Sequence, residues 1–206
     1  MKRILLMVGM LACGLNAFGA DKPAKNALLA SDKMVWAGLD YSKVRMIGPG
    51  EFHNPESIFP GMLQAWNDLF LQERIQFVEK ATGKQVIIDI DGVTEANKAA
   101  SAKQIVNEPG AQDGIDQSHI TATDIARAVK SYKMKNKSGL GVVFIVDRLI
   151  KQDKKGVGAV YVVAFDVDSR EVIFSDRVVG KAVGFGFRNF WFRVPKEAER
   201  GSKRLR

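Results

Sequence analysis

The 206-residue sequence contains a single cysteine, Cys13, and only two histidines, His53 and His119. A disulfide framework needs several cysteines, so this composition excludes one. Neither histidine has an acid or a second histidine at metal-ligand spacing, and we therefore predict no metal site. The chain also lacks a Gly-x-Ser-x-Gly segment and a phosphate-binding glycine loop, which argues against a serine hydrolase or a nucleotide-dependent enzyme. We expect no cofactor.

No apolar run approaches the roughly 20 residues that a membrane-spanning helix needs. The N-terminus instead has the features of a signal peptide. Lys2 and Arg3 precede an apolar run over residues 4–15, and the small residues of 16–20 offer a cleavage site. We predict that residues 1–20 are a signal peptide and that the protein is exported to a periplasmic or outer-membrane-associated location in a bacterium-like cell.

Cys13 lies inside this segment and has two interpretations. Cleavage after residue 20 would remove it and leave a mature chain without a thiol. The segment Met10-Leu11-Ala12-Cys13 is also compatible with a lipobox, in which Cys13 would be acylated and become the new N-terminus. We favour the first interpretation, because a lipobox normally has Leu where this chain has Met10.

The chain is basic, with a formal net charge of +8, and the excess is concentrated at its C-terminal end. We predict that residues 194–206 form a solvated basic tail. Such a tail can attract an anionic membrane surface by long-range electrostatics. Nucleic acid is not expected as a partner of an exported protein.

Between a small, polar tether at residues 21–33 and this tail, residues 34–193 read as one domain. Ser57 and Gly83 are suited to cap one helix, and Thr121 with Asp124 forms a capping-box pattern for another. The apolar patterns predict strands over residues 35–47 (with a bulge), 86–90, 140–150, 157–167 and 171–179, and helices over 60–81, 95–106 and 121–132.

The order of these elements predicts an α+β fold. Strand, helix, strand and helix are followed by three strands, of which the last two are joined by the short turn at residues 168–170, typical of an antiparallel hairpin. We therefore expect a mixed sheet of about five strands with a C-terminal antiparallel meander, and two or three helices packed on it.

The most enzyme-like segment is the apolar run that ends in Asp89-Ile90-Asp91-Gly92. It resembles the first motif of the haloacid-dehalogenase phosphatase superfamily. The resemblance implies Asp89 as the phosphoryl-accepting nucleophile and Mg²⁺ ligand, and Asp91 as the general acid/base. Asp-Gly after an apolar strand is also ordinary turn chemistry. The three successive strands at the end of the chain differ from the alternating strands and helices of that fold, so a phosphatase is our alternative function.

The segment over residues 180–193 is the most unusual in composition, with several glycines and five aromatic residues between 185 and 192. Stacking and cation–π contacts can make such a segment a binding surface. If it binds, the residues that do so are Phe187, Arg188, Phe190, Trp191 and Arg193. The other interpretation, which we favour, is that its aromatic side chains close the core after the last strand.

Two further resemblances concern exported proteins. The predicted hairpin over residues 160–175 is similar to the strand, turn and strand of envelope lipoproteins of the curli-secretion and TolB N-terminal-like group, which includes activators of penicillin-binding proteins. Residues 36–42, 65–69 and 184–191 together resemble a family of uncharacterised exported proteins of Gram-negative bacteria. The second resemblance spans most of the mature chain and implies no known activity.

The sequence thus predicts a non-catalytic binding or assembly module of the bacterial cell envelope, whose partner is another envelope protein. The alternatives are the Mg²⁺-dependent phosphatase acting through Asp89 and Asp91, and a structural envelope protein that self-associates.

Overall fold

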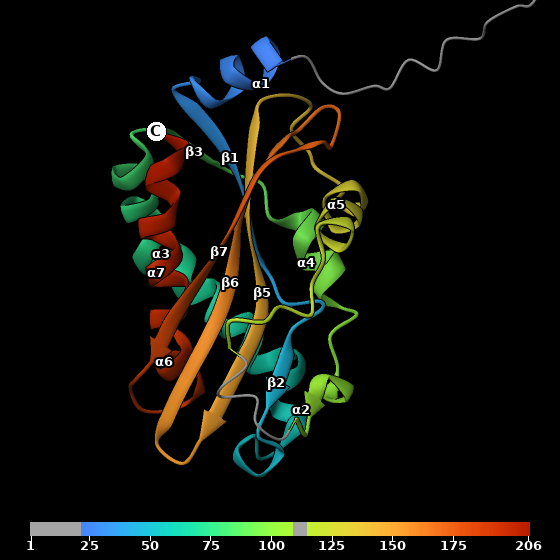
Figure 1. The fold of residues 1–206 in the computed structure, drawn as a ribbon, viewed down its shortest axis with the longest axis vertical. Coiled ribbons are helices and arrows are strands. Elements are labelled where there is room, and N and C mark those ends of the chain that lie inside the picture. The colour runs from blue at the N-terminus through green and yellow to red at the C-terminus, as the bar shows by residue number, and fades with distance from the viewer. Residues whose placement is uncertain (1–21, 109–114) are drawn as a thin grey trace, which may run out of the picture.

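A seven-stranded sheet forms the centre of the molecule (Figure 1). The computed structural model describes residues 22–108 and 115–206, so the predicted signal peptide and Cys13 lie outside the described residues. The strands are β1 (Lys33–Asp40), β2 (Arg45–Ile47), β3 (Gln85–Ile88), β4 (Ile105–Val106), β5 (Leu140–Gln152), β6 (Lys155–Asp166) and β7 (Val172–Ala182).

The long strand β5 organises this sheet. β1 and β2 lie end to end along one edge of β5, both parallel to it, because the chain breaks its extended course at residues 41–44. β3 pairs with β1 and β4 pairs with β2, again in parallel. On its other edge β5 pairs with β6, and β6 with β7, in antiparallel fashion.

The prediction of an α+β fold, with about five strands and a C-terminal antiparallel meander, is therefore wrong. The order β3-β1-β5-β2-β4 is parallel throughout, and the fold is of the α/β type. β6 and β7 run antiparallel to their neighbours but extend a mostly parallel sheet. Parallel neighbours require crossover connections, which the helices between β1 and β5 provide. The apolar pattern of each strand marks its burial but not the strand with which it pairs.

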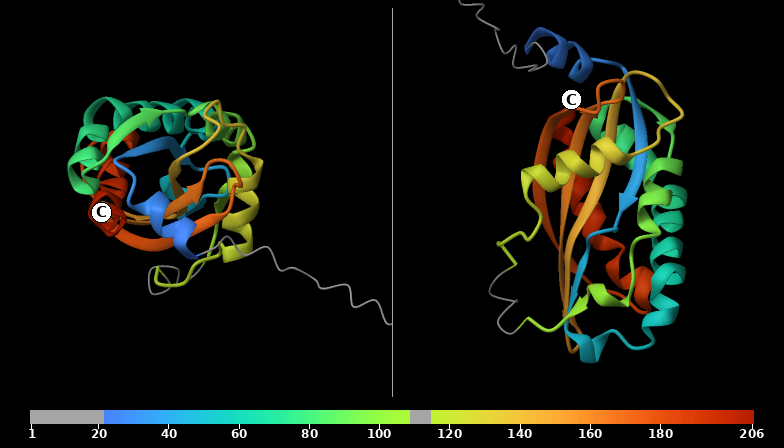
Figure 2. Two further views of the ribbon diagram at one scale, coloured as in Figure 1. Left: turned by 90° about the horizontal axis from the view of Figure 1, so that it is seen from above. Right: turned by 90° about the vertical axis from the view of Figure 1, so that its right-hand side faces the viewer.

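Helices cover both faces of the sheet (Figure 2). They are α1 (Lys22–Leu29), α2 (Pro55–Ser57), α3 (Leu63–Thr82), α4 (Asp91–Asn97), α5 (Ala122–Ser131), α6 (Phe187–Trp191) and α7 (Arg193–Gly201). The side chains of α3, α6 and α7 share one apolar core with Val142 and Phe144 of β5, whereas α4 and α5 share another with Val143 and Ile145. Alternate residues of β5 thus face opposite cores, and its residues 140–150 are all buried.

Several local predictions agree with these elements and others do not. α3 ends where Gly83 adopts a left-handed conformation (φ 70°), and Thr121 and Asp124 form the predicted capping box at α5. The helix predicted over residues 95–106 is instead α4, which ends at Asn97 and is followed by β4. Within the described residues no helix is long and apolar enough to cross a membrane.

The expected tether and the expected basic tail both differ from the structure. Residues 22–29 form α1, and the ammonium group of Lys84 donates hydrogen bonds to the carbonyl oxygens of Leu29 (2.6 Å) and Ser31 (2.5 Å). Residues 193–201 form α7, which packs on the sheet through the buried side chains of Val194 and Ala198. The charges of this segment are on one side of an amphipathic helix, and they concealed its apolar side from an argument based on composition.

Candidate binding site

A pocket of about 610 Å³ lies at the end of the molecule where β5 turns into β6. The chain after β2 and the chain after β7 supply most of its walls. It is lined by Glu51, Phe52, His53, Ile58, Met62, Lys151, Asp153, Lys154, Val183, Gly184, Phe185, Gly186, Phe187, Phe190 and Trp191. Eight of these side chains are apolar, and the charged side chains all come from residues 51–53 and 151–154.

The loop between β7 and α6 holds one aromatic side chain out into solvent. Gly184 (φ 140°) and Gly186 (φ 70°) have backbone conformations that favour glycine, and they flank Phe185. The amide of Val183 donates to the carbonyl oxygen of Phe190 (3.1 Å), which closes the loop against α6. Phe185 is 94% exposed. An aromatic side chain in this position lies at the mouth of the pocket without adding to the core.

The floor of the pocket consists of aromatic rings that also belong to the core. Trp191 is 1% exposed, and its ring lies 5.0 Å from that of Phe190 and 6.1 Å from that of Phe52, centre to centre. A Cβ at Gly156 would come within 2.5 Å of the Phe190 ring, so the absence of a side chain on β6 lets this ring pack there. The two interpretations of the aromatic segment are therefore compatible, because Phe190 and Trp191 both close the core and line the pocket.

The structure separates the five residues predicted to bind. Phe187, Phe190 and Trp191 line the pocket, whereas Arg188 and Arg193 are exposed and do not. Sequence reasoning missed the opposite wall and the charged rim, which are formed by Phe52, Ile58, Met62, Lys151 and Lys154. Nothing in the sequence pattern marks these residues, because the fold alone brings them to the aromatic segment.

The rim of the pocket contains one buttressed ion pair. The ammonium group of Lys151 lies 2.7 Å from Glu51 Oε2, and the amide of Asp153 donates to Glu51 Oε1 at 3.1 Å. The hydrogen bond from Lys151 holds the pKa of the Glu51 carboxyl below its ordinary value. Glu51 thus links the chain after β2 to the β5–β6 turn and is already neutralised by its neighbours.

The motif residues lie elsewhere, with Asp89 just after the edge strand β3 and Asp91 at the first residue of α4. Asp89 is 3% exposed, and its Oδ2 accepts hydrogen bonds from the backbone amide (2.8 Å) and the side-chain amide (2.9 Å) of Asn136. Asp91 is exposed and lies 2.6 Å from the ammonium group of Lys135. Both carboxylates therefore hold the chain after α5.

This arrangement does not fit the Mg²⁺ site that the phosphatase resemblance implies. The remaining oxygen of Asp89, Oδ1, is buried, whereas a magnesium ion usually keeps several waters and needs an accessible carboxylate. Among residues 22–108 and 115–206, no three His, Cys, Asp or Glu side chains are grouped as a metal-ligand set. Gly92 also has a packing role, because a Cβ there would approach the backbone nitrogen of Lys133 to 2.8 Å.

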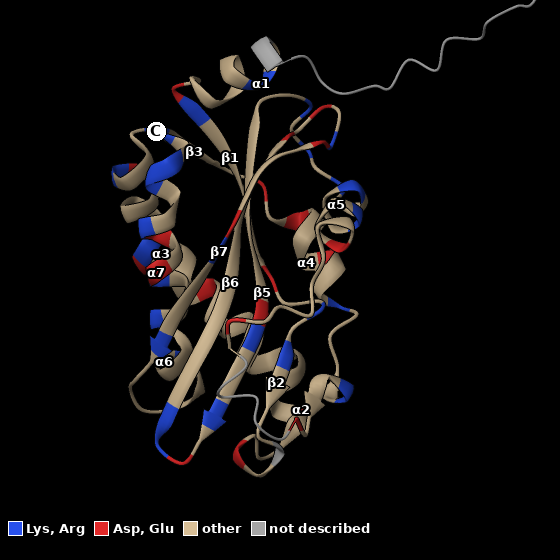
Figure 3. Cartoon of the chain, in the orientation of Figure 1, with Lys and Arg blue, Asp and Glu red and all other residues tan. Residues whose placement is uncertain are grey.

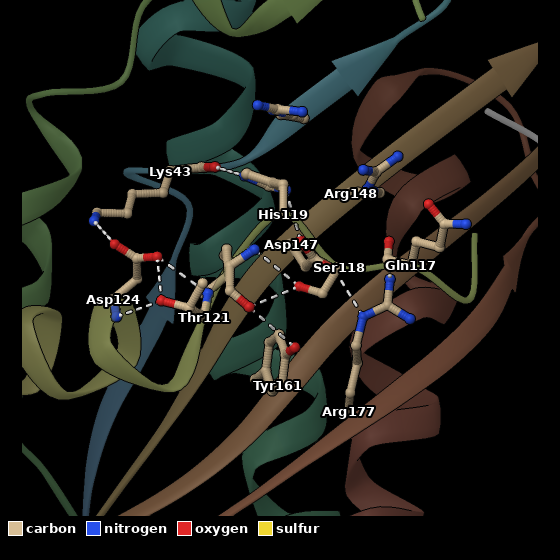
Figure 4. Close-up of polar contacts among 12 residues, drawn as sticks. Lys43, Gln117, Ser118, His119, Thr121, Asp124, Asp147, Arg148, Tyr161 and Arg177 are labelled. Atoms are coloured by element: carbon tan, nitrogen blue, oxygen red, sulfur yellow. Dashed lines mark hydrogen bonds and ion pairs between the residues drawn. The ribbon is translucent and has the colours of Figure 1, made fainter. Parts of the chain in front are cut away.

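A second polar cluster surrounds Asp147, a fully buried residue of β5 (Figure 4). Its carboxylate lies 2.7 Å from His119 Nδ1 and accepts a hydrogen bond of 2.7 Å from Arg177 Nε. Burial alone would raise the pKa of Asp147, but the hydrogen bonds from His119 and Arg177 outweigh it and leave the pKa below its ordinary value. The carboxylate is therefore ionised and lies between two donors.

The pairing of a histidine with a buried aspartate is also found in general-base catalysis, but the second ring nitrogen is not free here. His119 Nε2 lies 2.8 Å from the carbonyl oxygen of Lys43, so both nitrogens face oxygen atoms. Arg177 also donates to the carbonyl oxygen of Ile115 (2.7 Å). The cluster therefore fastens the chain before α5 to β5, β7 and the break between β1 and β2, and offers no base to a substrate.

No protein-family model matches the chain, and a comparison with curated proteins also finds no match. The resemblances to exported proteins therefore stay predictions. A second cavity, of about 410 Å³, lies beside His119, but most of its lining side chains are polar or charged, whereas the pocket at the β5–β6 turn is mainly apolar. The proposal below therefore rests on the pocket at the β5–β6 turn.

Proposed function

We propose that the protein is a non-catalytic binding module of the bacterial cell envelope, and that its pocket receives an apolar side chain of a partner protein. The observation that carries the proposal is an aromatic-lined pocket of about 610 Å³ with Phe185, 94% exposed, at its mouth. Binding pockets typically measure roughly 300 to 1,000 Å³ and are mainly apolar with a few polar groups.

The exposed apolar side chains around the mouth also support the proposal. Met62 is 37% exposed and Val183 is 50% exposed, and both line the pocket beside Phe185. Neighbouring exposed apolar residues mark interaction surfaces more often than scattered ones do. Pockets lined by aromatic residues are the usual receptors for the few anchor side chains that dominate protein–protein binding.

The position of the pocket in the molecule agrees with a partner outside the membrane. α1 lies at one end of the long axis and the β5–β6 turn lies at the other (Figure 1). Under the lipobox interpretation, which is not the one we favour, a chain held at the membrane by its N-terminus would point the pocket away from that membrane. A partner protein can reach the pocket in this orientation.

Site-specific photo-crosslinking tests the proposal. Full-length chain carrying p-benzoylphenylalanine in place of Phe185 is irradiated in the cells that produce it, and the same residue in place of Arg127 on α5 is the control, since the Arg127 side chain is 69% exposed on the opposite face. We expect a protein adduct of discrete mass from position 185 and none from position 127. Absence of a protein adduct at 185, or the same adducts at both positions, would refute the proposal.

A further inference from the structure

Four cations that are close in sequence to the lining of the pocket have no partner within the described part of the chain. Lys154 lines the pocket, and Lys155, Lys181 and Arg188 each lie within two residues of a lining residue. All four are exposed, and no ion pair or side-chain hydrogen bond involves them among residues 22–108 and 115–206. Figure 3 shows basic residues at the ends of β5 and β6 and along α6.

Two acids line the same pocket. Glu51 is already paired with Lys151, and Asp153 is the other acid that lines the pocket. Lys155 and Lys181 alternate with Gly156 and Ala182, which face Phe190, so these two lysines project from the other face of the sheet and leave Lys154 and Arg188 nearest to the pocket. Lys154 and Arg188 together therefore exceed the charge of Asp153 by one, and the mouth of the pocket carries a small positive excess.

We infer that the partner segment is an acidic peptide, in which one aromatic or large aliphatic side chain enters the pocket while flanking carboxylates face Lys154 and Arg188. The inference rests on the proposed function and adds the chemistry of the partner. Complementary charge around an apolar anchor speeds association and rejects basic or neutral competitors.

An anionic membrane would also be attracted to these cations, but it fits the shape of the site less well. The aromatic floor, formed by Phe52, Phe190 and Trp191, lies within a concave pocket, and none of these three side chains is more than 8% exposed. A side chain that projects from a peptide can reach this floor, whereas the surface of a bilayer would contact the rim and Phe185 and leave the pocket empty. The pocket therefore favours a peptide.

Selection from a random dodecapeptide library displayed on phage, with the full chain as bait, tests the inference. We expect the selected peptides to share an aromatic or large aliphatic residue with Asp or Glu beside it. A fluorescein-labelled selected peptide should bind about fivefold or more weakly when its acids are changed to amides, because the attraction at the rim is lost. It should also bind about fivefold or more weakly to Lys154→Glu, because the new carboxylate repels the acids of the peptide.

Two further variants of the protein keep the test specific. Lys130→Glu, an exposed lysine of α5, should leave peptide binding unchanged. Phe187→Ser, in the pocket wall, should abolish it if circular dichroism shows the variant folded. Raising the salt concentration should weaken binding to the native sequence more than binding to Lys154→Glu.

The outcomes separate the inference from the proposed function. Selected peptides that need Phe187 but carry no acids would overturn the inference and leave the pocket as a binding site. If no selected peptide depends on Phe187, the inference of an acidic peptide is overturned. If the protein then also sediments with phosphatidylglycerol vesicles but not with phosphatidylcholine vesicles, the cations serve a membrane instead. The binding of a partner protein at the pocket is tested separately, by the crosslinking at position 185.

Discussion

Replacing Asp147 by asparagine removes the one negative charge between His119 and Arg177. The carboxylate is fully buried, and the side chains of both partners are only 14% exposed, so solvent screens this cluster weakly. Breaking a buried ion pair by removing one partner costs about 3–5 kcal/mol, because the other charge is left buried without compensation. Asparagine keeps the volume and one acceptor oxygen, so we expect a loss of about 3 kcal/mol in the free energy of unfolding.

Urea denaturation followed by circular dichroism measures this loss. With a dependence of about 2 kcal/mol per molar urea, a loss of about 3 kcal/mol moves the midpoint down by about 1.5 M. Asp91→Asn is the matched control, since its side chain is 59% exposed and its removal should change stability little. A loss below about 1 kcal/mol for Asp147→Asn would show that the cluster does not hold the chain before α5 in place.

The same variant has a defined dependence on pH. Because the folded-state pKa of Asp147 lies below its ordinary value, its contribution to stability is complete above the unfolded-state pKa of about 4 and is lost as the pH falls through the folded-state pKa. The difference between the native sequence and Asp147→Asn should therefore narrow as the pH falls below about 4. A difference that widens on acidification would contradict the low pKa.

Two further predictions concern the motif between β3 and α4. Gly92→Ala should lower the free energy of unfolding by about 1–3 kcal/mol, because the new Cβ would meet the backbone of Lys133 at 2.8 Å. Thermal denaturation measures this loss. Gly50→Ala is the control and should leave the stability unchanged, because a Cβ at Gly50 meets nothing within 4 Å. With Mg²⁺, neither the native chain nor Asp89→Asn should release p-nitrophenol from p-nitrophenyl phosphate, because Asp89 is buried against Asn136. Turnover by the native chain that Asp89→Asn abolishes would establish a phosphatase instead.

The sequence was most informative where the residues of a single helix or strand are enough to locate it. The apolar residues of β5, Gly83 at the end of α3 and the capping box of α5 locate these elements without reference to the rest of the chain, whereas Ser57, the predicted N-terminal cap of the first helix, makes no capping hydrogen bond. The fold class depended on pairing between distant strands. β1 pairs with β3 about 50 residues away and with β5 about 105 residues away, and no local pattern records such a choice.

The candidate site was predictable to the same limited extent. The glycines and aromatic residues of the segment after β7 stand out by composition, so Phe187, Phe190 and Trp191 could be identified from the sequence. Phe52 and Lys154 could not, because they come from loops that the sheet alone brings to that segment. The surroundings of the Asp-Gly motif could not be predicted for a similar reason, since burial of Asp89 and the close approach to Gly92 depend on the chain that follows α5.

The central place of β5 has a consequence for the order in which the protein can fold. During synthesis from the N-terminus, β1 and β2 emerge about 100 residues before the strand that joins them, and β6 and β7 come later still. The emerging chain can form helices and the short pairings of β1 with β3 and β2 with β4, but not the sheet. A polypeptide that stays unfolded until its last third has been made is well suited to passage through a narrow export channel, which is the route that its N-terminal sequence predicts.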